Sequence, residues 1–134
     1  MSLIVDASVA VKWYLPERNS LEAEQILSTD TDLIAPEIVI AEVGNAVWKR
    51  LQKAEVSLEL AGDIIERAAT AFSLLVPLKD LARQAMLLAV RHRHSIYDCF
   101  YVALAQQAVA PLATADAKLA VLATQIGIEV ELLG

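Results

Sequence analysis

The sequence is poor in the residues that mark several classes of protein. Its 134 residues include one cysteine, four glycines and four prolines, and only 5% are aromatic. The lone Cys99 cannot close an internal disulfide, and it excludes a cysteine-rich zinc module. So few glycines and prolines exclude collagen-like and low-complexity sequences. Because 57% of the residues are hydrophobic, intrinsic disorder is excluded as well.

Long apolar runs are also missing. The longest stretch without a charged residue is Cys99–Ala115, and two glutamines, a proline and a threonine make it a poor membrane span. Residues 1–5 carry no basic residue, and Asp6 interrupts the apolar start at once. That start is unlike a secretory signal peptide. We therefore expect a cytoplasmic protein with no membrane partner, whose single thiol is buried.

Positive charge is the third scarcity. Eleven Lys and Arg face seventeen Asp and Glu, which gives a net charge of −6. A polyanion such as nucleic acid normally binds a basic surface, so this balance by itself argues against a nucleic-acid partner. The inference holds only if the carboxylates merely decorate the surface. It fails if some of them hold a cation, so their positions matter.

Hydrophobic periodicity predicts an alternation of short strands and amphipathic helices. We expect strands at 3–5, 33–35, 112–114 and 128–130, with 73–76 either a strand or an extended link. We expect helices at 8–15, 19–28, 36–52, 57–71, 79–93, 95–107 and 117–125. This alternation predicts an α/β fold with a mostly parallel sheet flanked by helices, in a single domain over residues 1–134. Sites in such folds lie at the carboxyl ends of the strands.

Four acidic residues are candidates for a site there. Asp6 follows the first strand, Asp116 follows strand 112–114, Asp98 opens a very apolar helix, and Glu42 projects from the helix after the second strand. Taken singly, each has a structural explanation as a turn residue, a helix cap or part of a solvated helix face. Taken together at one sheet edge, they would repel one another, and burial would raise their pKa values. A divalent cation resolves that conflict, and oxygen ligands favour Mg²⁺ or Mn²⁺, which act on phosphate esters.

The segments around these acids resemble the four motifs of the PIN-domain family. They are Ile4–Ser8, Ala41–Ala46, Tyr97–Ala105 and Leu112–Asp116. More narrowly, the chain resembles the toxin ribonucleases of VapBC-type toxin–antitoxin pairs. The likeness covers the whole chain in length and motif order, and the third segment is its most specific part.

The resemblance implies a metal-dependent endoribonuclease with a PIN-like parallel sheet of about five strands. Asp6 and Asp98 would be the core metal ligands, and Glu42 and Asp116 would complete the site directly or through water. Three polar residues would support it, namely Ser8, Thr114 and, in a lesser role, Asn45. The cofactor would be Mg²⁺, with Mn²⁺ as an alternative, as one or two ions. The implied partners are an RNA substrate, a small antitoxin protein and a second copy of the chain.

Histidines and basic residues near helix ends have simpler explanations. His92 and His94 do not share a helical face, and a helix C-terminus accommodates histidine well, so we assign them a structural role. Two basic groups also end helices, and each either complements the helix dipole or contacts RNA phosphate. These groups are Arg91 with Arg93, and Lys49 with Arg50 and Lys53.

Aromatic side chains are expected in the core by default. This applies to Trp13, Tyr14 and Trp48, with an apolar groove for an antitoxin helix as the alternative. Tyr97 and Tyr101 share a helical face at i, i+4, which we expect to point inward.

Two other functions remain open from the sequence. A receiver-type phosphoacceptor domain would need an aspartate after a mid-chain strand and a late lysine, but residues 36–71 have the pattern of two helices and Asp116 stands where no lysine does. A catalytically silent PIN-like interaction module is the alternative from a different class. The presence of all four acids argues against it but does not prove turnover, so metal binding without RNA cleavage would favour it.

Overall fold

A five-stranded parallel sheet forms the centre of the molecule. The computed structural model describes residues 1–134, and its strands are β1 (Ser2–Val5), β2 (Asp32–Pro36), β3 (Leu74–Val76), β4 (Leu112–Thr114) and β5 (Val130–Leu132). They lie in the order β3-β2-β1-β4-β5, and every neighbouring pair is parallel. The inner strands consist mainly of buried aliphatic residues, as expected of a parallel sheet covered on both faces.

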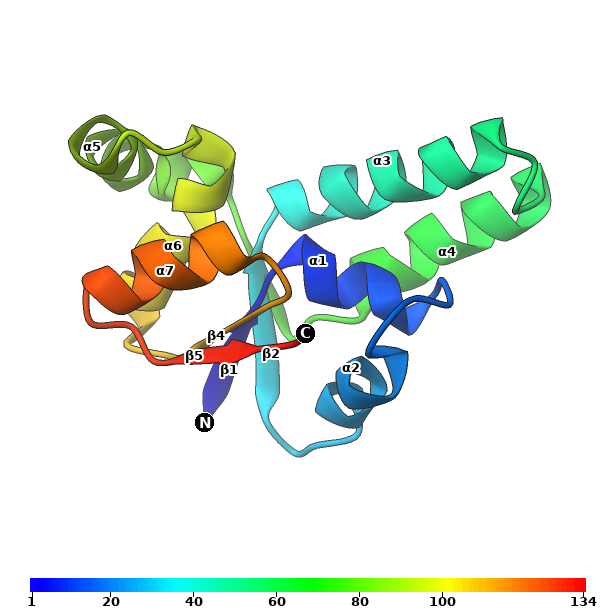
Figure 1. Cartoon of the computed structure of the whole chain (residues 1–134), viewed down its shortest axis with the longest axis horizontal. Helices are drawn as coiled ribbons and strands as arrows, with labels where there is room; N and C mark the ends of the chain where they lie inside the picture. Colours follow the sequence, from blue (N-terminus) through cyan, green and yellow to red (C-terminus); the bar gives the residue numbers. More distant parts are fainter.

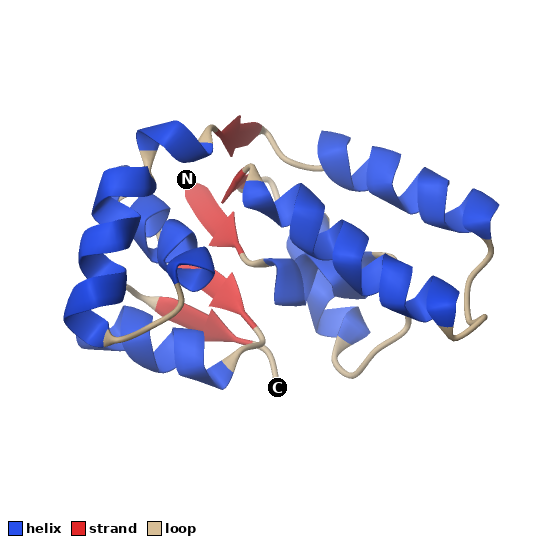
Figure 2. Ribbon diagram, turned by 90° about the horizontal axis from the view of Figure 1, so that it is seen from above, coloured by secondary structure: helices blue, strands red, loops and turns tan.

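Helices cover both faces of this sheet (Figure 2). The first half of the chain supplies α1 (Ala7–Ala10), the 3₁₀ turn η1 (Val11–Trp13), α2 (Ser20–Leu27), α3 (Ile38–Gln52) and α4 (Leu58–Thr70). The second half supplies the 3₁₀ turn η2 (Leu78–Asp80), α5 (Ala82–His92), α6 (Ile96–Ala108) and α7 (Ala117–Gln125). Figure 1 shows α3 and α4 side by side as a pair that projects away from the sheet, with α1 near the base of α3.

The strand order reverses between β1 and β4. From β1 the chain adds β2 and β3 on one side, then returns to place β4 and β5 on the other. Right-handed crossovers put the helices of the two halves on opposite faces. Such a reversal leaves a crevice at the carboxyl ends of the two central strands, where ligands of doubly wound folds bind. The residues that follow β1 and β4 therefore meet at this switch point.

Helix α6 is the most deeply buried helix. Its residues Cys99–Ala105 are all buried between the sheet and the neighbouring helices. The Cys99 thiol is fully buried, as predicted, and burial raises its pKa to about 11. The thiol therefore stays protonated at neutral pH.

The strand at 112–114 and the helix at 117–125 lie where the sequence predicts them, and residues 73–76 do contain a strand. The helix expected over 79–93 is instead η2 followed by α5, and the last strand starts at Val130 rather than at 128. No helix has both the length and the apolar character that crossing a membrane requires.

The expectation of core packing is correct for Trp13 and Tyr101 and wrong for two other aromatic residues. Trp48 is 54% exposed and Tyr97 is 60% exposed. The buried face of α3 is formed by Val39, Val43 and Val47. Trp48 is the next residue after Val47, so the turn of the helix directs its side chain away from that face. Tyr97 lies in the first turn of α6, before the buried segment begins.

Candidate functional site

Asp6 is the most buried acid of the candidate site. It follows β1 directly, is 5% exposed, and its Oδ2 accepts hydrogen bonds from Ser8 Oγ at 2.6 Å and Thr114 Oγ1 at 2.8 Å. Burial raises the pKa of Asp6, the two hydroxyl bonds oppose that rise, and the charge of Asp98 adds to it. Ser8 and Thr114 therefore both donate to the same oxygen of Asp6.

Hydroxyl groups also tie the loop after β4 to the loop after β1. Ala115 N donates to Ser8 Oγ at 2.9 Å, and Asp116 N donates to Thr114 Oγ1 at 3.0 Å. Thr114 is fully buried, so its single hydroxyl connects the backbone of Asp116 with the carboxylate of Asp6. The geometry of the switch point is fixed by these short contacts.

Glu42 reaches the same region from α3. Tyr101, fully buried in α6, donates its hydroxyl proton to Glu42 Oε1 at 2.7 Å. The pKa of Glu42 is raised to about 7, chiefly by desolvation and also by the charges of Asp6 and Asp98, while the Tyr101 hydrogen bond opposes the rise. Burial also raises the pKa of Tyr101, so the phenol remains a donor.

Asp98 is held by a histidine that the sequence analysis assigned to a helix end. His94 Nε2 lies 2.8 Å from Asp98 Oδ2, and the two side chains are 17% and 25% exposed. His94 lies just beyond the end of α5 at His92, and between them Arg93 adopts a left-handed conformation with φ of 51°. This turn directs the chain toward α6. The i, i+4 spacing of His94 and Asp98 could have indicated this contact. A helix boundary lies between the two residues, so the spacing was not interpreted as a pair on one helix.

Asp116 has a confirmed local role as a helix cap. Its Oδ1 accepts from Lys118 N at 2.9 Å and from Leu119 N at 3.4 Å, at the start of α7. Asp116 is not among the charges that act on Asp6 or Glu42. Asn45, on α3, is exposed and forms no hydrogen bond to the acids. The structure therefore brings Asp6, Glu42 and Asp98 close enough for their charges to interact, and it uses the Asp116 carboxylate to cap α7.

The side chains as placed do not form a ready metal site. No three His, Cys, Asp or Glu residues are grouped closely enough to hold a metal ion together. The donor set nevertheless fits a hard cation. Three carboxylates repel one another, none of them pairs with a lysine or arginine, and oxygen ligands select Mg²⁺ or Mn²⁺. The side chains would have to move closer together to bind one.

Each of the four acids also has one oxygen held by the protein. Hydrogen bonds engage Oδ2 of Asp6, Oε1 of Glu42, Oδ2 of Asp98 and Oδ1 of Asp116. The second oxygen of each has no hydrogen bond from another side chain. A carboxylate anchored through one oxygen is oriented and still has a donor atom for an incoming cation.

An open groove of ≈ 640 Å³ has Glu42, but none of the other three acids, in its lining. It runs between α1 and η1 on one side and α3 on the other, and Tyr97 of α6 also lines it. Polar and charged side chains line most of its length: Ser8, Glu17, Glu42, Asn45, Lys49, Arg50 and Lys53. The groove therefore joins the acidic edge of the sheet to a basic region at the far end of α3.

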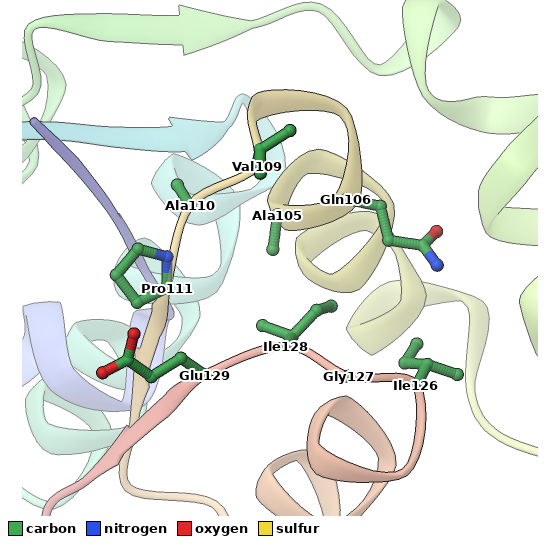
Figure 3. Close-up of a pocket in the computed structure, with 9 residues that line it drawn as sticks. All are labelled: Ala105, Gln106, Val109, Ala110, Pro111, Ile126, Gly127, Ile128 and Glu129. Carbon is green, nitrogen blue, oxygen red and sulfur yellow. The ribbon is translucent and has the colours of Figure 1, made fainter.

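A second pocket, of ≈ 360 Å³, lies at the amino ends of β4 and β5, away from the switch point (Figure 3). It is formed by the end of α6, the start of β4 and the segment between α7 and β5. Glu129 is the only ionisable residue that lines it. This pocket lacks the grouping of polar side chains that chemistry would need, so the candidate site is the switch point.

The fold and the site define a class of protein: a doubly wound parallel α/β domain with carboxylates gathered at its switch point. The chain belongs to the PIN domain family, which matches residues 3–125. It is 32% identical over 122 residues to Ribonuclease VapC3 of Pyrobaculum aerophilum, covering 90% of this chain and 93% of that protein.

Solved structures share this fold. The crystal structure of VapC20 from Mycobacterium tuberculosis, described as a sarcin-ricin loop cleaving toxin, has a TM-score of 0.75 at 16% identity, covering 95% of this chain and 96% of that chain. The crystal structure of PAE2754 from Pyrobaculum aerophilum has a TM-score of 0.72 at 23% identity, covering 97% of this chain and 83% of that chain. At these identities the likeness shows a common fold.

Proposed function

We propose that this protein is a metal-dependent endoribonuclease, acts as one domain over residues 1–134, and is the toxin of a VapBC-type toxin–antitoxin pair. The observation that carries the proposal is the approach of Asp6, Glu42 and Asp98 to one another at the switch point, where the pKa values of Asp6 and Glu42 are raised and no lysine or arginine pairs with any of the three. The relative named Ribonuclease VapC3 supports the same activity. The proposal also accounts for an acidic protein that acts on a polyanion.

In this proposal Asp6 and Asp98 are the principal ligands of Mg²⁺ or Mn²⁺, and Glu42 and Asp116 complete the site directly or through water. The cation, when bound, would stabilise negative charge on the phosphoryl oxygens of RNA and make hydrolysis by water feasible at neutral pH. It would also favour the ionised forms of the acids, which reverses the pKa shifts that burial and mutual repulsion produce.

The surrounding residues act by fixing the acids. Ser8 and Thr114 hold Asp6, and Tyr101 holds Glu42. His94 fixes Oδ2 of Asp98, which leaves the other oxygen of that carboxylate available to a cation. Partners of this kind orient ligands, and their loss typically lowers metal affinity or activity by about 10- to 100-fold.

Two protein partners belong to the proposal. One is a small antitoxin that neutralises the nuclease, and the other is a second copy of the chain in a homodimer. The antitoxin is tested by co-expression with a small reading frame from next to the gene, where suppression of toxicity is expected. The dimer is tested by light scattering of the purified chain, where a monomer at all concentrations would contradict it.

The activity is tested with purified protein and 5′-labelled RNA in Mg²⁺ or Mn²⁺. Wild-type protein should cleave the RNA internally, and Asp98→Asn should reduce the rate at least 100-fold, because a principal metal ligand is lost. Asp63→Asn removes an exposed acid of α4 and serves as the matched control. Undiminished cleavage by Asp98→Asn would contradict the assignment of the site.

Calorimetric titration of Mn²⁺ separates a nuclease from a silent interaction module. Both would bind Mn²⁺ through Asp6 and Asp98, so the Asp6→Asn variant should lose binding in either case. Only the nuclease also cleaves RNA. Metal binding without cleavage of single-stranded, structured or transfer RNA would favour the module.

A further inference from the structure

The groove that Glu42 lines has acidic and basic side chains at different points along its length, and the proposed function assigns no role to the basic ones. We propose that this groove binds the RNA strand next to the cleaved bond, with Tyr97 stacking on a base at the acidic end and Lys49 and Lys53 holding phosphates at the basic end. The inference rests on the proposed function and assigns positioning residues to it.

The spacing along α3 sets the direction of the groove. Glu42, Asn45, Lys49 and Lys53 follow one another at intervals of three, four and four residues, which places them on one face. At about 1.5 Å of rise per residue, Lys49 lies roughly 10 Å and Lys53 roughly 16 Å beyond Glu42 along the helix axis. A stretch of a few nucleotides that starts at the acids would therefore reach both lysines.

The two lysines differ from the arginine between them. Lys49 and Lys53 are exposed and have no ion-pair partner. Arg50, in contrast, pairs with Glu17 at 3.2 Å and with Glu55 at 3.5 Å. The charges of Arg50 and Glu17 largely cancel within the groove, so Lys49 and Lys53 are its available cations. Free ammonium groups along a groove are what the phosphates of a nucleic acid strand require.

Tyr97 marks the other end of the groove. It precedes Asp98 directly in the chain, lines the same groove as Glu42, and is 60% exposed. No aromatic side chain packs against its ring, so the fold itself does not explain an aromatic residue there. Exposed aromatic rings in a groove with basic side chains serve as stacking platforms for the bases of single strands. Its place beside the acids puts the stacked base next to the scissile phosphate.

The test measures RNA binding without turnover. Fluorescence anisotropy with a labelled single-stranded 12-nucleotide RNA is recorded in EDTA at several salt concentrations. Four variants are compared with the wild type: Tyr97→Ala, Tyr97→Phe, the double variant Lys49→Ala with Lys53→Ala, and the control Lys79→Ala with Arg83→Ala. The control removes the same total charge from exposed residues near the start of α5, outside the groove.

The two kinds of contact give different signatures. The groove double variant should reduce the slope of log affinity against log salt by about 1.4, at 0.7 per phosphate contact, while the control leaves it near the wild-type value. Tyr97→Ala should weaken binding about tenfold without changing the slope, and Tyr97→Phe should bind like the wild type because the ring is kept. Equal slopes for the two double variants, or wild-type affinity of Tyr97→Ala, would overturn the inference.

Failure of this inference and failure of the proposed function can be told apart. If the variants behave as expected but the wild type cleaves no RNA in Mn²⁺, the groove binds RNA and the nuclease proposal fails. If the wild type cleaves RNA but the variants bind it normally, the groove does not bind the strand. Variants that bind RNA normally but no longer form a complex with a co-expressed antitoxin would assign the groove to a protein partner and contradict the inference.

Discussion

The buried carboxylate of Asp6 shows how a few atoms define the site. Two hydroxyls donate to its Oδ2, and Thr114 also accepts from the backbone of Asp116. These contacts join the ends of β1 and β4, which are 106 or more residues apart in the chain. The position of the Asp6 side chain therefore depends on contacts between distant segments rather than on its local sequence.

Removing the Thr114 hydroxyl should destabilise the fold. Thr114→Val keeps the shape but leaves Asp6 with one donor fewer and the Asp116 N–H without its acceptor. We expect a loss of about 1–3 kcal/mol in the free energy of unfolding, measured by urea denaturation. Thr70→Val changes an exposed residue at the end of α4 and should stay within about 0.5 kcal/mol of the wild type. Equal stabilities of the two variants would contradict the role assigned to Thr114.

The raised pKa of Glu42 predicts how stability depends on pH in chelated protein. Desolvation raises this pKa from 4.5 to about 7 in the folded state, so the folded protein binds a proton that the unfolded chain has released. Stability should therefore fall as the pH rises from about 4.5 to about 7, and this contribution should be constant above that range.

Thermal melting in EDTA across this pH range measures the effect. Glu42→Gln should show a flatter dependence of melting temperature on pH than the wild type. Some dependence should remain, because the pKa of Asp6 is raised as well and has the same sign. Parallel curves for the two proteins would show that Glu42 is not desolvated as the structure indicates.

At the scale of the helices and strands, much of the fold follows from the sequence. Strand 112–114 and helix 117–125 are bounded by strong local signals, an apolar run and an aspartate cap, and they lie where predicted. The acids Asp6 and Glu42 could be placed near the sheet edge for the same reason, since each follows a predicted strand or lies on the helix after one.

Other features depend on contacts that no local pattern carries. The approach of His94 to Asp98 requires the left-handed turn at Arg93, a conformation that arginine rarely adopts. The exposure of Tyr97 depends on where the sheet stops covering α6, and the cap formed by Asp116 competes with its predicted place among the other acids. Tertiary contacts determine these features, and the local sequence does not distinguish the alternatives.

The end of α6 offers a test of helix termination. Val109 ends this helix with φ of 50° and is 91% exposed, so a β-branched residue occupies a left-handed position that favours glycine. Val109→Gly should stabilise the protein by about 1 kcal/mol. Val121→Gly, at an exposed position inside α7, should instead destabilise it by about 1 kcal/mol. Chemical denaturation of both variants checks the contrast, and a loss of stability in Val109→Gly would contradict it.

At the scale of the whole molecule, the net charge of −6 is a poor guide to its partners. Three acids lie together at the switch point, and a divalent ion there would set the local field. The lysines of the groove add positive charge a short distance away. The distribution of charge, and not its sum, determines which ligand the protein can bind.

Metal binding should therefore be visible in the stability of the whole protein. Mn²⁺ at about 100 times its dissociation constant should add about 2.7 kcal/mol to the free energy of unfolding, which raises the melting temperature by several degrees. Asp98→Asn should lose most of this shift, and Asp63→Asn should keep it. An identical shift in wild type and Asp98→Asn would place the bound ion elsewhere.

The most direct test of the central claim is the metal requirement of RNA cleavage. Purified protein is treated with EDTA, and Mn²⁺ is then titrated back while cleavage of a labelled RNA is followed. We predict no cleavage in EDTA and a saturable return of activity with added Mn²⁺ in the wild type but not in Asp98→Asn. Cleavage that persists in EDTA, or that returns equally in Asp98→Asn, would contradict the account.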